Sequence, residues 1–117
     1  MSMHATLGVK FADNSIVGCY VHMDGATMES RIRLFVDELT TTGLTLLITE
    51  AQAVGGIRSF NTPNVNMAID GKLRETEMLD DEPYVIDEKN WEDDHMGTCC
   101  RYLVDYQTGE IAVKKMY

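Results

Sequence analysis

Residues 16–25, I-V-G-C-Y-V-H-M-D-G, decide how the rest of this chain is interpreted. Side chains alternate along the stretch, as expected for a strand. One face would carry Val17, Cys19, Val21 and Met23, and the other Ile16, Gly18, Tyr20 and His22. Asp24-Gly25 then ends the strand, because glycine frees the backbone to turn. We therefore expect a strand that pairs with the residues before it and packs against the residues after it.

The residues before this stretch have the pattern of a partner strand. Apolar groups occupy alternate positions over residues 5–11, A-T-L-G-V-K-F, with small or polar residues between them. Asp13-Asn14 supplies turn chemistry, since both residues tolerate left-handed backbone angles. The sequence therefore predicts an N-terminal hairpin.

The residues after the stretch have helical spacing. Thr27 is the expected N-cap, and apolar residues recur from 28 to 39, which predicts a helix over residues 28–41 with Gly43 as its C-cap. A second helix is predicted from Leu44 to the glycine pair at 55–56. The threonine run at 40–42 weakens both helices, because β-branched residues are poor helix formers.

The second half of the chain is less regular until its end. Residues 57–64 are expected to form a loop, residues 65–69 a third strand, and residues 87–94 a solvated segment anchored by Trp91. A second hairpin is predicted from residues 99–106 and 111–117 around the turn at 107–110. These elements predict one α+β domain over residues 1–117: an antiparallel sheet built from the N- and C-terminal hairpins, with one or two helices packed on one face.

Composition excludes several classes of protein. The chain has 117 residues, of which 44% are hydrophobic, which is enough for a packed core. No apolar run is long enough to span a bilayer, and the first residues lack the features of a signal peptide. Three cysteines, two of them adjacent, do not form a disulfide framework, so we expect a reducing cytoplasm and no membrane partner.

The formal net charge of −9 disfavours DNA and RNA as partners, because such a surface repels phosphates. Acidic residues gather in the second half of the chain, chiefly at 80–82 and 92–94. Two interpretations remain open: a solvated surface, or a surface that imitates nucleic acid and binds a basic groove on another protein. Neither acidic triplet has the spacing of a calcium loop.

Two candidate arrangements for chemistry are weak. His22 and Asp24 have the spacing of an acid–base pair on one strand face, or of a structural histidine beside a turn aspartate. Cys99-Cys100 with His95 is a poor metal set, because adjacent cysteines in a strand point to opposite faces. We assign no catalytic residue, no metal site and no cofactor.

The stretch with the most residues suited to binding a ligand is 55–61, G-G-I-R-S-F-N. Glycines permit close backbone approach, Arg58 is suited to phosphate and Phe60 to base stacking. The alternative is a helix stop followed by an exposed arginine and a core phenylalanine. The lysine and Ser/Thr ending of a P-loop is missing.

The stretch from 16 to 25 also resembles a family of small phage proteins with a Cys-His-Trp-Asp-Gly-like signature after the first hairpin, here with Met23 in place of the tryptophan. Their later L-I-x-x-G-D-I-S-S-L-like stretch corresponds to G-L-T-L-L-I-T-E-A-Q-A-V-G-G-I-R-S-F, and their acidic, tryptophan-containing end to W-E-D-D-H-M-G-T-C-C-R-Y-L-V-D-Y-Q-T-G-E. This pattern is similar to the phage anti-Thoeris sponge family. The resemblance implies a protein that binds a cyclic ADP-ribose-type messenger or a cyclic oligonucleotide without hydrolysis, as a homo-oligomer with the ligand at subunit interfaces.

The resemblance does not fix individual binding residues, so candidates are chosen by residue type. They are Arg58, Phe60, Asn61 and Arg101, with Arg31 and Arg33 as second choices. Acids distant from the site are screened by salt within about 8 Å, so the net charge does not forbid a local arginine cluster. The alternative function is a phage inhibitor that binds a host defence protein directly through the acidic surface, and an enzyme ranks third.

Overall fold

The computed structural model describes residues 3–23, 25–60 and 76–116. In chain order the elements are β1 (Ala5–Lys10), β2 (Ile16–Val21), the 3-10 helix η1 (Gly25–Thr27), α1 (Glu29–Ala53), β3 (Ile57–Ser59), β4 (Glu77–Met78), β5 (Ile86–Asp87), β6 (Cys100–Asp105) and β7 (Ile111–Lys115). The strand predicted at 65–69 lies outside the described residues, as do Asp24 and Asn61. The helices described are too short or too polar to cross a membrane.

The strands form one mixed sheet in the order β4-β3-β2-β1-β6-β7, with β5 paired to β2. Both predicted hairpins are confirmed as antiparallel pairs, β1 with β2 and β6 with β7. The hairpins are joined edge to edge by β1 and β6, which run parallel, and β2 and β3 are also parallel. The predicted α+β class and the mostly antiparallel sheet are therefore confirmed, with two parallel pairs that the prediction did not include.

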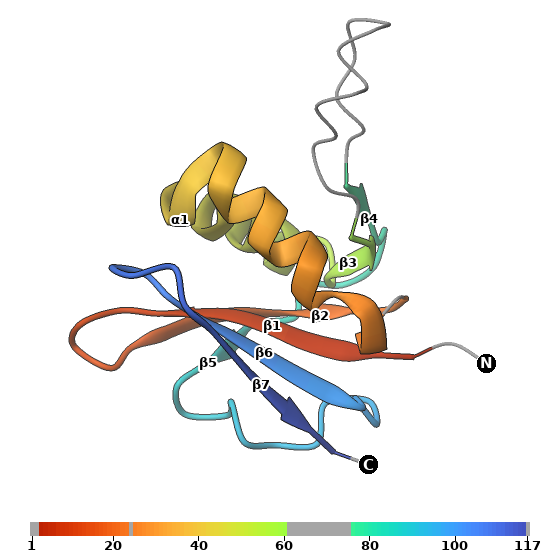
Figure 1. Ribbon diagram of the computed structural model, residues 1–117. Helices are drawn as coiled ribbons and strands as arrows, with labels where there is room; N and C mark the ends of the chain where they lie inside the picture. Colours follow the sequence, from red (N-terminus) through yellow and green to blue (C-terminus); the bar gives the residue numbers. More distant parts are fainter. Residues whose placement is uncertain (1–2, 24, 61–75, 117) are drawn as a thin grey trace, which may run out of the picture.

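Helix α1 lies across one face of this sheet (Figure 1). It is divided by a kink at Thr40, whose φ of 68° and ψ of 171° are not helical. The predicted division into two helices, weakened at the threonine run 40–42, is confirmed, but the C-cap predicted at Gly43 is wrong. Contacts with the β6–β7 turn hold the observed kink: Thr41 Oγ1 donates to the Tyr106 carbonyl at 2.7 Å, and Thr42 Oγ1 lies 2.9 Å from the Tyr106 hydroxyl.

The predicted N-cap at Thr27 is also wrong, because the cap position falls on Met28, without a side-chain capping bond. Thr27 belongs instead to η1. The reason lies in the turn before it, where Gly25 N–H donates to the Met3 carbonyl at 2.8 Å and the Tyr102 hydroxyl donates to the Gly25 carbonyl at 2.5 Å. These bonds fix the turn as a short 3-10 helix and delay the start of α1.

The helix-side core is mostly aliphatic and fills the space between α1 and the sheet. It contains Ala5, Leu7, Val9, Cys19, Val21, Met28, Ile32, Phe35, Leu44, Ile48, Ala51, Ile57, Phe60, Cys100, Tyr102 and Val104. Cys19 and Val21 lie on the face of β2 expected from the alternation. Their burial accounts for the strength of that periodic signal.

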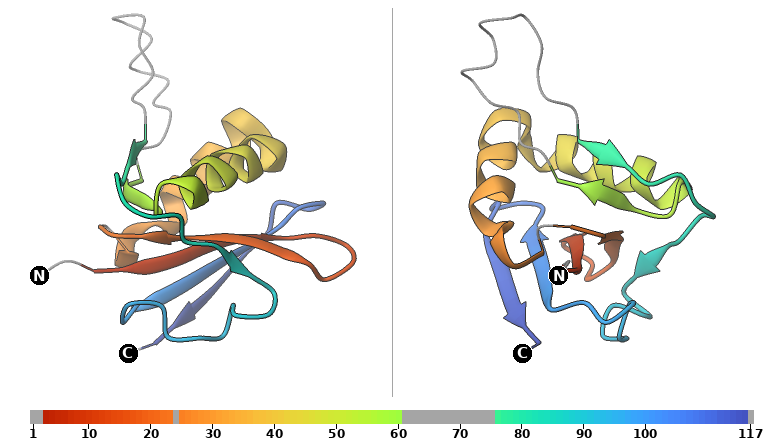
Figure 2. Two further views of the ribbon diagram at one scale, coloured as in Figure 1. Left: turned by 180° about the vertical axis from the view of Figure 1, so that it is seen from behind. Right: turned by 90° about the vertical axis from the view of Figure 1, so that its right-hand side faces the viewer.

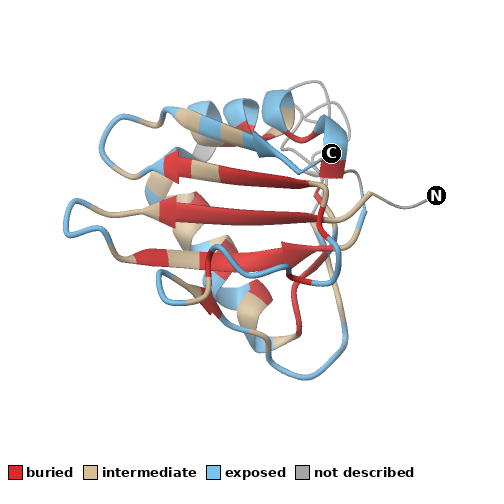
Figure 3. Cartoon of the chain, turned by 90° about the horizontal axis from the view of Figure 1, so that it is seen from below, coloured by how far each residue is buried: buried red, intermediate tan, exposed pale blue. Residues whose placement is uncertain are grey.

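Residues 79–99, here called the crossing segment, begin beside the C-terminal end of α1 and then pass onto the other face of the sheet (Figure 2). Its anchor is Trp91, which is 6% exposed and packs with Ile16, Tyr20 and Ile86 in a second small core. Gly8 and Gly18 are paired across β1 and β2, and a Cβ on Gly8 would lie 2.7 Å from the indole. Two adjacent strands therefore present a flat glycine surface on which the tryptophan rests. Figure 3 views this face and shows the buried central strands.

Candidate functional site

The ends of β1 and β2 bring two histidines into contact. His4 precedes β1 and His22 follows β2, and the antiparallel register pairs Ala5 with Val21. The two imidazoles are stacked, with ring centroids 4.8 Å apart and an interplanar angle of 24°. His4 Nδ1–H donates to the His22 carbonyl at 2.7 Å, and the Tyr20 hydroxyl is 2.9 Å from His22 Nδ1.

Two residues of the crossing segment extend this arrangement. The Tyr84 ring lies 6.4 Å from that of Tyr20, and its hydroxyl is 2.5 Å from His95 Nδ1. His95 is buried, and its Nε2 is 2.7 Å from the Asn90 carbonyl. A carbonyl can only accept, so His95 Nε2–H donates to the Asn90 carbonyl.

These five side chains, His4, Tyr20, His22, Tyr84 and His95, form what we call the histidine–tyrosine surface. It gathers every histidine of the sequence. Burial raises the pKa of Tyr20, with a smaller contribution from Tyr84, and burial followed by the charge of Asp93 raises the pKa of Tyr84. Both hydroxyls therefore remain protonated at neutral pH, and the surface offers aromatic planes and hydrogen bonds rather than phenolate charge.

Arg58 supplies a cation beside this surface. The main chains of β2 and β3 are joined where Val21 pairs with Ile57, and His22 N–H donates to the Ile57 carbonyl at 2.8 Å. Ile57 is buried in the helix-side core, and Arg58 directly follows this residue, whose carbonyl accepts from His22 N–H. The Arg58 side chain is exposed. This end of the sheet therefore combines an accessible guanidinium with stacked imidazoles, which suits an anion joined to a planar ring.

The other predicted ligand residues are dispersed. Phe60 is fully buried against Phe35, with ring centroids 5.6 Å apart, so its ring belongs to the core rather than to a stacking surface. Arg31 is half-buried, and its Nη1 lies 3.4 Å from the Phe60 carbonyl. Arg31 of α1 therefore contacts the residue that follows β3. Asn61 is outside the described residues.

Arg101 and Arg33 lie elsewhere. Arg101 is 4% exposed, and its guanidinium donates to the Glu92 carboxylate at 2.7 Å and to the carbonyls of Glu92 and Asp93 at 2.7 and 2.9 Å. Its role in the described structure is to fasten the crossing segment to β6. Arg33 is exposed on α1 beside Leu34, in a shallow depression of about 460 Å³.

Sequence reasoning missed most of the histidine–tyrosine surface. The signal available was the two-residue spacing of Tyr20 and His22, which places both on one face of β2. His4 could have been added from the hairpin register, because the start of one strand meets the end of the other. Nothing in the periodicity connects Tyr84 or His95 to this edge, since they reach it through an irregular segment.

The adjacent cysteines differ from expectation. The prediction that they point to opposite faces is wrong, because their Sγ atoms are 3.5 Å apart. Cys99 precedes the first residue of β6, so strand alternation does not yet apply to it. His95 uses both ring nitrogens on Tyr84 and Asn90. Among the described residues, no three His, Cys, Asp or Glu side chains are grouped closely enough to hold a metal ion.

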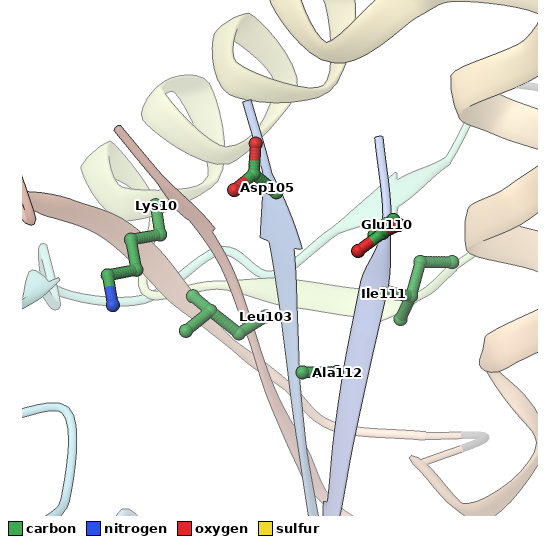
Figure 4. A pocket seen from close by; sticks show the side chains of 6 residues that line it. All are labelled: Lys10, Leu103, Asp105, Glu110, Ile111 and Ala112. Atoms are coloured by element: carbon green, nitrogen blue, oxygen red, sulfur yellow. The ribbon is translucent and has the colours of Figure 1, made fainter. Parts of the chain in front are cut away.

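A second hollow, of about 270 Å³, lies on the part of the sheet formed by β1, β6 and β7 (Figure 4). It is lined by Lys10, Leu103, Asp105, Glu110, Ile111 and Ala112. Charges of both signs surround its apolar residues, so it lacks the excess of positive charge that an anionic ligand needs. None of the predicted ligand residues lines it.

Comparison with protein-family models, curated protein sequences and solved structures finds no match to this chain. The function is therefore argued from the geometry and chemistry of the surface itself.

Proposed function

We propose that this protein is a phage-encoded binding protein that captures a small cyclic signalling nucleotide, of the ADP-ribose or oligonucleotide type, without cleaving it. The observation that supports this best is the exposed Arg58 beside the stacked imidazoles of His4 and His22. The sequence resemblance to the anti-Thoeris sponges points to the same class of ligand.

Each part of the surface matches a part of such a ligand. The Arg58 guanidinium pairs with a phosphate, and the exposed sides of the half-buried His4 and His22 imidazoles accept a base by stacking. Their hydrogen bonds hold the rings in place before the ligand arrives, which lowers the entropy lost on binding. The nearby hydroxyls stay neutral, so the surface binds by contact and charge rather than by proton transfer.

One chain offers only one side of an enclosed site, because His22 follows the end of β2 and the nearby Arg58 side chain in β3 is exposed. We propose that a second copy of the chain completes the site, so that the ligand lies between subunits of a homo-oligomer. The complex would act in the cytoplasm of the infected cell, where the messenger is made.

The test is a thermal-shift titration with cyclic ADP-ribose isomers and cyclic oligonucleotides, followed by recovery of the ligand from heat-denatured complex. Ligand at 100 times its dissociation constant should add about 2.7 kcal/mol to the free energy of unfolding. Arg58→Ala and His22→Ala should each weaken binding at least about tenfold, as expected for the loss of about 1.4 kcal/mol. Arg33→Ala makes the same change of charge on α1 and should have no effect.

A shift with intact ligand supports the proposal, and a shift with altered ligand would identify an enzyme instead. The absence of a shift with any of these nucleotides would overturn it. Equal losses in the Arg58→Ala and Arg33→Ala variants would show that binding occurs at another surface.

A second function is favoured by the carboxylates of the crossing segment. Asp80, Asp81, Glu82, Glu88, Glu92, Asp93 and Asp94 are all exposed. We propose as the alternative that this acidic surface binds a basic groove of a host defence protein. Capture of such a protein should weaken steeply as salt is raised and should be lost when Asp80, Asp81 and Glu82 are neutralised, whereas Arg58→Ala should not affect it.

A further inference from the structure

Cys99 and Cys100 form a close pair of thiols at the start of β6. The Cys99 S–H points to Cys100 Sγ at 3.5 Å. Cys99 is half-buried, whereas Cys100 is 1% exposed, so reagents reach Cys99 first. The third cysteine, Cys19, is fully buried in the helix-side core and serves as an internal reference.

The backbone of Cys99 supports the histidine pair. Cys99 N–H donates to the His4 carbonyl at 2.8 Å, and the Cys99 carbonyl accepts from Met116 N–H at 2.7 Å. His4 in turn donates to the His22 carbonyl and stacks on the His22 ring. A change in the backbone at Cys99 is therefore transmitted to His4 through one hydrogen bond, and to His22 through the next.

We propose that Cys99 and Cys100 are a reversible modification site that reacts with low-molecular-weight disulfides and closes to a disulfide between adjacent residues, which moves His4. The Cys99 thiolate attacks one sulfur of oxidised glutathione, and the glutathione disulfide breaks to release one glutathione thiolate. The Cys100 thiolate then attacks Cys99 Sγ and releases the second glutathione. Two electrons pass from the protein sulfurs to glutathione, and the two protons of the protein thiols leave with the two glutathione molecules.

Ring closure is expected to disturb the backbone. Adjacent Cα atoms are about 3.8 Å apart, which is shorter than the separation of about 4.4–6.8 Å usual for a disulfide. The peptide between the two cysteines must turn to bring the sulfurs together, and this loosens the bonds of Cys99 to His4 and Met116. Strained disulfides are readily reduced, so the modification is reversible. Its effect on ligand capture rests on the proposed function, but the sulfur chemistry does not.

The reaction should be slow at neutral pH. Burial, followed by the hydrogen bond and charge of Cys100, raises the pKa of the Cys99 thiol to about 11. The thiolate is the attacking species, so below this pH the rate should rise about tenfold for each pH unit.

The test is to treat the full chain with oxidised glutathione, alkylate it after denaturation, and analyse tryptic peptides by mass spectrometry. Cleavage after Lys89 and Arg101 releases residues 90–101, which contain both cysteines. We expect this peptide to lose two hydrogen atoms and to take no alkyl group, while the Cys19 peptide takes one. Full alkylation at Cys99 and Cys100, or a stable mixed disulfide, would overturn ring closure.

Two variants and a spectrum sharpen the result. Cys100→Ser should stop at a mixed disulfide on Cys99, whereas Cys99→Ser should remain unmodified because Cys100 is buried. In the wild type, oxidation should shift the ring signals of His4 and His22 in a two-dimensional NMR spectrum, and dithiothreitol should restore them. Unchanged ring signals after ring closure would refute the coupling to His4. None of these measurements needs the nucleotide, so they stand apart from the test of the proposed function.

Discussion

The two faces of the sheet are covered by different kinds of structure. On the helix side, α1 buries a continuous aliphatic core. On the other side, the irregular crossing segment rests on one tryptophan and encloses polar residues: Thr6, His95, Thr98 and Arg101 are all buried. Thr6 Oγ1, Thr98 Oγ1 and Arg101 Nε have no hydrogen-bond partner among the described residues. Each buried polar atom without a hydrogen bond lowers the free energy of unfolding by about 1–3 kcal/mol.

The apolar core and the buried polar residues therefore lie on opposite sides of the sheet. The helix side contributes the burial that makes the fold stable. The crossing side bears the histidine–tyrosine surface and the buried arginine, whose polar groups reduce stability unless each is paired. We therefore expect mutations on the crossing side to destabilise the nearby strand β5 first, and mutations on the helix side to destabilise all strands together.

The largest effect should come from removing the anchor of the crossing side. Trp91→Ala should destabilise the protein by about 3–5 kcal/mol, because the indole fills most of the second core. Hydrogen exchange should then lose protection at β5 first, whereas Ile48→Ala in the helix-side core should weaken all strands together. Equal loss of protection at β5 and β1 in Trp91→Ala would contradict the separation of the two sides.

The next prediction concerns the contact between the Trp91 indole and the glycines of β1 and β2. Gly8→Ala should destabilise by about 1–3 kcal/mol, since the added Cβ would approach the indole to 2.7 Å. In a Trp91→Leu background the distant ring atoms are gone, and the same change should have little effect when both are measured by urea unfolding. A similar loss in both backgrounds would place the strain elsewhere.

A smaller effect concerns pH and belongs to the helix side. Burial raises the pKa of the Cys19 thiol above its ordinary value of 9.0. Above pH 9 the unfolded chain releases this proton while the folded chain keeps it, so the free energy of unfolding should fall by about 1.4 kcal/mol per pH unit. Cys19→Ala should show a shallower fall between about pH 9 and 10 in urea unfolding. Parallel curves would refute this assignment.

The smallest effect is expected at the surface of the crossing side. Lys114 Nζ is 3.4 Å from the Glu92 carboxylate, but both side chains are exposed, by 62% and 73%. Lys114→Ala should therefore change stability by no more than about 0.5 kcal/mol. Arg101→Met removes the buried partner of the same carboxylate and should have a clearly larger effect, because the carbonyls of Glu92 and Asp93 lose their donor. Equal effects would show that burial does not decide the strength of these pairs.

Alternation predicted both hairpins and the two faces of β2, because one face meets an aliphatic core and the other a glycine and tryptophan surface. Trp91 was correctly expected to anchor its segment, since a lone large aromatic in an acidic stretch needs a buried site. The weakened region at residues 40–42 and the alternative of a core phenylalanine at 60 are both confirmed, whereas the exact place of the kink, at Thr40, depends on tertiary contacts with Tyr106. Periodicity also carries no information on which strands pair. The parallel pairing of β1 with β6 and the contact between the histidines could therefore not be predicted from it.

The parallel contact between β1 and β6 has a consequence for the timing of folding. Ala5 pairs with Cys100, so one edge of β1 finds its partner only when the chain as far as β6 has left the ribosome. Until then an apolar strand presents unpaired backbone groups to its surroundings, which is the condition under which strands pair with the wrong chain. Contacts between such distant residues also slow folding. The yield of native protein should therefore depend on the speed of synthesis and on temperature more strongly than the stability of the finished fold suggests.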